Sequence, residues 1–297
     1  MTGSSTAERT RSLRSRLVCC RQGASSPHDA PNASPTACAA EWPFSAAHAV
    51  SGSWVKTRVP VVLLFILAPH AMAAEAGHWQ KLLHNHTFAG WRSPSGHTPI
   101  EGAWTIANGV LTAKPYVQHR TDLWTTGQYE DFELEWEWKA AKGANSGVKY
   151  WVQRAVTMVV VKEDVEWRRV ADPREAANET TLEYSVGLEY QMADDAHEPA
   201  SLERANSRAG GLYGLFAPSP EAVKPHDQWN RSRVVARDGR FEHWLNGKQT
   251  LGFDLAKLEA RLNEAKQTDR LGRRRGPIAL QYHQTVVSFR RMRVRRL

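Results

Sequence analysis

Residues 132–138 read F-E-L-E-W-E-W, and this unbroken alternation predicts a β-strand with two different faces. Successive side chains of a strand point to opposite sides of its sheet. The apolar face carries Phe132, Leu134, Trp136 and Trp138, and the polar face carries Glu133, Glu135 and Glu137. One side of this strand is therefore suited to a core, and the other to water or to a ligand.

The chain from residue 104 onward continues as short segments with strand character, separated by turn dipeptides such as Asn108-Gly109, Asp238-Gly239 and Asn246-Gly247. We expect strands at 104–106, 110–113, 147–152, 156–161, 186–192, three within 231–253, 278–283 and 286–294. Residues 168–180 are polar and predict a surface loop, and residues 255–266 have the spacing of the one convincing helix. The pattern predicts an all-β sandwich of two antiparallel sheets, with one short helix near the C-terminus.

The first part of the chain has a different character. Residues 54–73 resemble a secretory signal peptide, with Lys56 and Arg58 ahead of an apolar run and an Ala71-Met72-Ala73 cleavage site. Residues 1–53 lack periodicity and are interpreted as a disordered extension or as the product of a start site assigned too far upstream. We therefore expect a single domain over residues 74–297 that is exported to the periplasm or beyond, without a membrane anchor.

Composition excludes several classes of protein. The three cysteines (Cys19, Cys20 and Cys38) lie upstream of the predicted domain, so disulfides and cysteine-bound metals are not expected in the fold. About half of the net charge of +8 lies in the first 73 residues. Arginine clusters at 270–275 and 290–296 could suggest nucleic acid, but export and a strand-like setting favour a solvated edge, and we expect no nucleic-acid partner.

Strand parity gathers polar and aromatic side chains opposite the predicted core. Besides the three glutamates of residues 132–138, this set contains Lys149, Trp151, Glu189, Gln191, Glu242, Trp244, Gln281 and His283. A solvated outer face explains any one of them. Together they suggest a carbohydrate site, because aromatic rings stack on sugars while carboxylates and amides bind hydroxyls. His243 has the opposite parity and is predicted to lie in the core.

A set of segments, in order along the chain, resembles the 3-keto-disaccharide hydrolase family. The segments are A-G-W (89–91), W-T-I-A-N-G-V-L-T (104–112), L-W-T-T-G-Q-Y-E-D-F-E-L-E-W-E-W (123–138), N-S-G-V-K-Y (145–150), G-L-E-Y-Q-M-A-D-D (187–195), L-Y-G-L-F-A-P (212–218), K-P-H-D-Q-W-N (224–230) and E-H-W-L-N-G (242–247). The resemblance covers nearly all of the predicted domain and implies a concanavalin A-like jelly roll. One departure is that Tyr282 and Gln284 stand where the family usually has Asp and Gly around its histidine.

The resemblance also implies which residues surround the site. They are Glu137, Asn145, Glu189, Gln191, Lys224, His243 and His283, with Arg208 and Tyr213 closing the site. For His243 this implication conflicts with the strand alternation, which places its side chain in the core.

The implied reaction is elimination on an oxidised sugar. A ketone at C3 acidifies the C2 hydrogen, so a base can remove it, the aglycone can leave, and water can add to the resulting enone. Glu189 or His283 is the expected base, and Lys224 with Asn145 is expected at the developing oxyanion. A divalent cation is possible but no ligand spacing identifies one, and a companion sugar oxidoreductase is a possible partner.

Two alternatives remain open at this point. The same sandwich could be a non-catalytic carbohydrate-binding module. It could also be an ordinary glycosidase that uses two carboxylates, such as Glu133 and Glu137.

Overall fold

The computed structural model describes residues 77–162 and 166–297. The predicted extension over residues 1–53 and the predicted signal peptide over residues 54–73 lie outside the described residues. Within the described part, no helix is both long enough and apolar enough to cross a bilayer.

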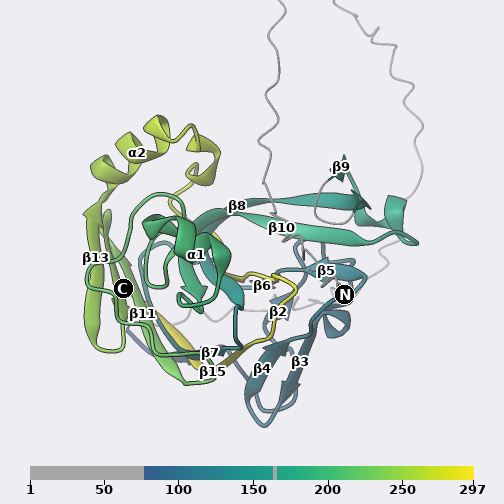
Figure 1. Ribbon diagram of the computed structural model, residues 1–297, viewed down its shortest axis with the longest axis horizontal. Coiled ribbons are helices and arrows are strands. Elements are labelled where there is room, and N and C mark those ends of the chain that lie inside the picture. The colour runs from purple at the N-terminus through teal and green to yellow at the C-terminus, as the bar shows by residue number, and fades with distance from the viewer. Residues whose placement is uncertain (1–76, 163–165) are drawn as a thin grey trace, which may run out of the picture. The chain divides into compact units, whose positions relative to one another are not determined.

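The described residues form two β-sheets, as predicted (Figure 1). The first sheet has the order β13 (Lys248–Asp254), β12 (Arg240–Leu245), β11 (Asn230–Arg237), β7 (Phe132–Ala140), β15 (Val287–Arg296), β4 (Val110–Ala113) and β3 (Trp104–Ala107), with β1 (Gln80–Lys81) paired to β15. The second has the order β2 (Trp91–Arg92), β6 (Leu123–Thr125), β14 (Ala279–Leu280), β8 (Asn145–Lys162), β10 (Thr181–Ala193) and β5 (His119–Thr121), with β9 (Glu166–Val170) paired to β8. β5 and β10 run parallel, whereas β8 is antiparallel to β10.

The two sheets pack through the apolar faces of their central strands. Phe132, Leu134, Trp136 and Trp138 of β7 are at most 1% exposed, which confirms the parity of the opening stretch. Trp136 meets Tyr190 of β10 edge to face, with 4.9 Å between ring centroids. Full burial of a large apolar side chain stabilises a fold by about 1.5–3 kcal/mol. The alternation in the sequence thus produces the sandwich core.

A β-bulge interrupts the long β8–β10 pair. The register between the two strands shifts between Val186 and Leu188, and Trp151 on β8 has a φ of 47°. Its ring is 2% exposed and lies 5.0 Å from Phe241 of the other sheet. The prediction that Trp151 shares a face with Lys149 is therefore wrong, because the bulge reverses the alternation after Tyr150.

The segment 154–183 is more regular than its polar sequence suggests. β8 continues without a break to Lys162, and β9 covers the first part of the predicted loop at 168–180. A 3₁₀ turn follows at Pro173–Ala176. Figure 1 shows β8 and β10 extending together toward β9, at the end of the sheet away from α2.

The predicted helix is present as α2 (Leu255–Glu264), and buried Leu258 and Leu262 fix its inner face. Asp254 caps its first turn by accepting a hydrogen bond from Lys257 N at 2.8 Å. A second helix of five residues, α1 (Pro199–Glu203), is not among the elements predicted from the sequence. The strand expected over 278–283 is shorter, because only Ala279–Leu280 pair as β14 and Gln281 and His283 follow it.

Candidate active site

The three glutamates of β7 lie on the outer face of the first sheet, where arginines flank each of them. The ion pairs are Arg295–Glu133, Arg233–Glu133 at 3.3 Å, Arg293–Glu135 at 2.7 Å, Arg231–Glu135 at 3.2 Å, Arg290–Glu137 at 2.7 Å and Arg291–Glu137 at 3.1 Å. Burial alone would raise the pKa of Glu135 and of Glu137, but the arginines outweigh it and hold both pKa values below the ordinary range. Carboxylates held in this way are ionised and already paired, which is typical of a network of structural ion pairs.

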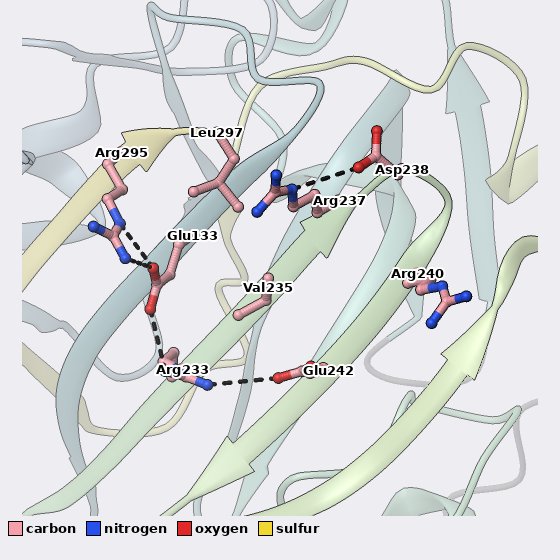
Figure 2. A pocket seen from close by; sticks show the side chains of 9 residues that line it. All are labelled: Glu133, Arg233, Val235, Arg237, Asp238, Arg240, Glu242, Arg295 and Leu297. Carbon is pink, nitrogen blue, oxygen red and sulfur yellow. Dashed lines mark hydrogen bonds and ion pairs between the residues drawn. The ribbon is translucent and has the colours of Figure 1, made fainter. Parts of the chain in front are cut away.

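Glu242 and Trp244 of β12 belong to the same outer face. Figure 2 shows Glu242 joined to Arg233, which also reaches Glu133. These residues line a hollow of about 510 Å³. The guanidinium of Arg233 lies 4.6 Å from the centre of the Trp244 ring, and the indole N–H donates to Glu242 at 2.8 Å. The expectation that polar residues of five strands share one face is therefore wrong, because each of the two sheets has an outer face of its own.

His243 lies between the sheets, as its parity predicts and contrary to the placement that the resemblance implies. It is fully buried, and its Nε2 lies 3.0 Å from the Tyr150 hydroxyl. Burial lowers the pKa of His243 to about 3, so the ring is neutral at ordinary pH. We interpret it as a hydrogen-bonded core histidine.

The outer face of the second sheet brings the other predicted residues together. Lys149 stands opposite Glu189, and Gly147 stands opposite Gln191, across the β8–β10 pair. Ala279 of β14 stands opposite Lys149 on its other side. We call the group on this face the Glu189 cluster; it consists of Asn145, Lys149, Glu189, Gln191 and Gln281, together with Asp122 at its base.

A buried ammonium group sits at the base of the Glu189 cluster. Lys149 is 1% exposed, and its Nζ lies 3.4 Å from Asp122 Oδ2 and 3.8 Å from Glu189 Oε2. It donates to the carbonyl of Ser185 at 3.0 Å and lies 3.6 Å from the centre of the Tyr184 ring. Burial alone would lower the pKa of Lys149, but the neighbouring acids outweigh it and raise the pKa. Lys149 is thus a fixed cation, with its hydrogen bonds directed at the protein.

Asp122 connects the segments that carry this face. Its Oδ1 accepts from Tyr282 N at 2.8 Å, and its Oδ2 accepts from Ser185 N at 2.9 Å. These bonds link the end of β14 and the middle of β10 to the short connection between β5 and β6. Lys149 adds β8 to the same junction.

Glu189 is the central carboxylate of the cluster. It is 2% exposed, and burial raises its pKa, although Lys149 and Arg270 oppose that shift. A Cβ placed on Gly147 would lie 2.6 Å from Glu189 Oε1, so the carboxylate lies over the glycine. A carboxylate with a raised pKa is a stronger base than an exposed one, which is the property that proton abstraction requires.

Two further groups border Glu189. The Tyr213 backbone N–H donates to Glu189 O at 2.9 Å, and burial, with the Glu189 charge, raises the pKa of its phenol. Arg270 donates to the carbonyls of Gly187 and Tyr213 at 2.9 and 2.8 Å. The Tyr213 phenol is therefore a protonated donor beside the candidate base.

His283 lies near the same group of charges. The residue is exposed, and partial desolvation of its ring is the main cause that lowers the pKa of the imidazole. Glu198 opposes the shift, and Lys149 adds to it. The imidazole is neutral and able to accept a proton. The next residue, Gln284, has a φ of 55°, which L residues adopt at a cost and which explains why a glycine suits this position.

A chain of side-chain hydrogen bonds runs along the edge of the cluster. Asn145 Nδ2 donates to Glu198 Oε1 at 3.3 Å, and Gln191 Nε2 donates to Asn145 Oδ1 at 3.1 Å. Glu198 also caps α1 by accepting from Ser201 N at 2.8 Å. Asn145 therefore orients Gln191, and its two bonds leave it less free for the predicted oxyanion role.

Lys224 and Arg208 lie on loops outside the Glu189 cluster. Lys224 Nζ donates to Trp229 O at 3.0 Å, and the lysine has no hydrogen bond or ion pair to the cluster. Arg208 pairs with Glu221 and donates to Ser201 O at 3.3 Å. The placement of Lys224 at the developing oxyanion is not supported by these contacts.

Sequence reasoning missed Asp122, Tyr184, Glu198 and Arg270. All four come from segments whose strand parity is interrupted or absent, so alternation carried no signal for them.

In the described part of the chain, no group of three or more His, Cys, Asp and Glu side chains is arranged to hold a metal ion. The hollow of Figure 2 and a second one of about 510 Å³ beside Ser95 and Val156 both lie away from Glu189.

Comparison with known proteins identifies related sequences and folds. The profile of the 3-keto-alpha-glucoside-1,2-lyase-like domain matches residues 78–295. A 3-keto-disaccharide hydrolase from Bacteroides thetaiotaomicron is 28% identical over 192 residues, which span 62% of this chain and 61% of that relative. A crystal structure described as a "putative glycosyl hydrolase" from Parabacteroides distasonis is 25% identical with a TM-score of 0.58, over 74% of this chain and 94% of that one. A second crystal structure from that organism, 23% identical with a TM-score of 0.52, covers 74% of this chain and 100% of its own and has the same fold.

Proposed function

This chain belongs to the family of 3-keto-alpha-glucoside-1,2-lyase-like domains, and from that membership we propose that it is a hydrolase or lyase of 3-keto-glycosides or 3-keto-disaccharides. The chain spans about 61% of the length of the curated relative, so its own activity is part of the proposal. The observation that carries the proposal is the buried Glu189 carboxylate, held over Gly147 among amides and a fixed ammonium.

In the proposed reaction, Glu189 removes the C2 proton of the 3-keto sugar. The electrons of the broken C–H bond form an enolate, whose oxygen is the former C3 ketone. The enolate collapses to an enone as the bond between C1 and the glycosidic oxygen breaks, and that oxygen takes up a proton as it leaves. Water then adds to the enone and completes the hydrolysis.

The contacts of the cluster support specific roles. Lys149 and Arg270 oppose the effect of burial and thereby favour the ionised form of Glu189. The Tyr213 phenol and the neutral His283 ring are the candidates to donate to the oxyanion or to exchange a proton with the leaving group, in place of Lys224. His283 also remains the second candidate for the base. No step in this scheme requires Glu137.

The proposal extends to export and to the source of the substrate. Export rests on the signal-like pattern of residues 54–73. A ketone at C3 is a product of sugar oxidation, so a separate oxidoreductase would supply the substrate.

One assay separates this proposal from the alternatives. The purified protein is offered a chromogenic glucoside and the 3-keto derivative of that glucoside. Release of the chromophore from the keto form alone supports the proposal, and release from both supports a two-carboxylate glycosidase. Binding without release supports a carbohydrate-binding module.

A further inference from the structure

Two buried amide oxygens of the Glu189 cluster lack a hydrogen-bond donor. In the described part of the protein, Gln191 Oε1 and Gln281 Oε1 have no partner, and their residues are 0% and 7% exposed. They stand in one row across three segments: Gln191 lies opposite Gly147, and Gln281 N donates to Gly147 O at 2.9 Å. A buried polar atom without a partner costs about 1–3 kcal/mol, so such atoms usually indicate a bound ligand or water.

The orientation of the Gln191 amide follows from its neighbours. Asn145 turns its NH₂ group toward Glu198, because its Nδ2 donates to the carboxylate Oε1 at 3.3 Å. The carbonyl oxygen of Asn145 then faces Gln191, which must present its own NH₂ group in return. Consequently, Gln191 Oε1 is left as an acceptor, and exchanging the two ends of the amide would break this chain.

The row contains a third acceptor, the carboxylate of Glu189. The Glu189 carboxylate lies over Gly147, between the two glutamines in the row. A ligand that fits must bring either O–H groups or a cation. Lys149 lies 3.8 Å from Glu189, and Arg270 also acts on its charge, so protein cations already compensate this carboxylate. Neutral hydroxyl groups fit this electrostatic setting better than a metal ion does.

We propose that the row formed by Gln191, Gly147 and Gln281 accepts hydrogen bonds from free hydroxyls of the same sugar ring that Glu189 deprotonates. The proposal rests on the function proposed above and adds a substrate requirement. The sugar must carry free hydroxyls at this row, so deoxy and O-methylated sugars are poor ligands. A ketone oxygen has no proton to donate, so the C3 ketone points away from the two glutamines.

The test measures binding rather than turnover, which keeps it separate from the proposed activity. Methyl α-D-glucoside and its 2-deoxy, 4-deoxy and 6-deoxy analogues are titrated calorimetrically into wild-type protein, Gln191→Leu and Gln281→Leu. We expect at least one analogue to bind wild-type protein roughly 3- to 10-fold more weakly than the parent sugar, the size of one lost hydrogen bond. The corresponding leucine variant should show no such difference between parent and analogue.

Controls cover folding and alternative ligands. Gln281→Leu leaves the bonds of Asn145 intact, and Gln249→Leu removes an exposed glutamine of the other sheet; both should melt close to the wild-type temperature. The proposal is overturned if both leucine variants bind the deoxy analogues more weakly than the parent sugar by the same factor as wild-type protein does. It is also overturned if wild-type protein does not bind the parent sugar. Binding of Ca²⁺ or Mg²⁺ that the leucine variants abolish would overturn it as well. If sugar binding behaves as expected but no 3-keto-glycoside is turned over, the proposed function fails and the hydroxyl row stands.

Discussion

Lys149→Met is the most informative test of the electrostatics of the Glu189 cluster. Methionine keeps most of the length and apolar volume of lysine, but it removes the ammonium that lies 3.4 Å from Asp122 and 3.8 Å from Glu189. Removing one partner of a buried ion pair costs about 3–5 kcal/mol, because the remaining charge stays buried without compensation. At about 2–4 °C per kcal/mol for a domain of this size, the melting temperature should fall by roughly 6–20 °C near pH 7.5.

The pH dependence of this loss has a definite sign. Burial already raises the pKa of Glu189, and loss of the ammonium raises it further. A carboxyl group whose folded pKa lies above its unfolded pKa stabilises the fold at low pH, and this contribution is lost as the pH rises through the folded value. The deficit of Lys149→Met relative to wild type should therefore be larger at pH 8 than at pH 5.

The assay is thermal unfolding of wild type, Lys149→Met, the double variant Lys149→Met/Glu189→Gln and the control Lys248→Met. Lys248 is exposed on β13, and its replacement should change stability by no more than about 0.5 kcal/mol. The double variant should be more stable than Lys149→Met, since it no longer buries the Glu189 charge. A melting temperature for Lys149→Met within about 2 °C of wild type would show that Lys149 does not compensate the buried carboxylates. A double variant no more stable than Lys149→Met would show the same for Glu189.

Three further predictions concern backbone and core. Gly147→Ala places a Cβ 2.6 Å from Glu189 Oε1 and should cost about 1–3 kcal/mol in urea unfolding; an unchanged midpoint would mean that the carboxylate does not lie over the glycine. His243 remains neutral in the fold, with a pKa of about 3, so wild-type stability should fall between pH 7 and pH 4.5 as the unfolded state takes up a proton. In His243→Phe the fall in stability over this pH range should be smaller. An equal fall would contradict the interpretation of His243 as a neutral core histidine. Gln284→Gly relieves a φ of 55° and should raise the denaturant midpoint, by up to about 1 kcal/mol in stability, whereas a lower midpoint would contradict a strained backbone.

The sequence alone predicts the sandwich and much of its core. Alternation places Phe132, Leu134, Trp136 and Trp138 inside, and all four are buried. The same reasoning places Lys149, Glu189 and Gln191 on one outer face, where the structure also has them. These successes depend on strands that keep their alternation through the residues in question.

The failures have two physical causes. Parity separates the inside of a strand from its outside, but a sandwich has two outsides, and only strand pairing decides between them. This is why Glu137, Glu242 and Trp244 are found on the other sheet. The second cause is the bulge near Gly187, which turns Trp151 inward because the register shifts there. Neither long-range pairing nor a bulge is specified by short-range alternation.

We propose that the chemistry takes place at Glu189, on the outer face of the second sheet. The most direct measurement is kcat/KM for a 3-keto-glucoside with Glu189→Gln and with Glu137→Gln, two substitutions of the same size on opposite faces. We predict a loss of at least roughly 100-fold for Glu189→Gln, the contribution of a general base, and a change within about twofold for Glu137→Gln. Normal turnover by Glu189→Gln, or a comparable loss in Glu137→Gln, would contradict the claim.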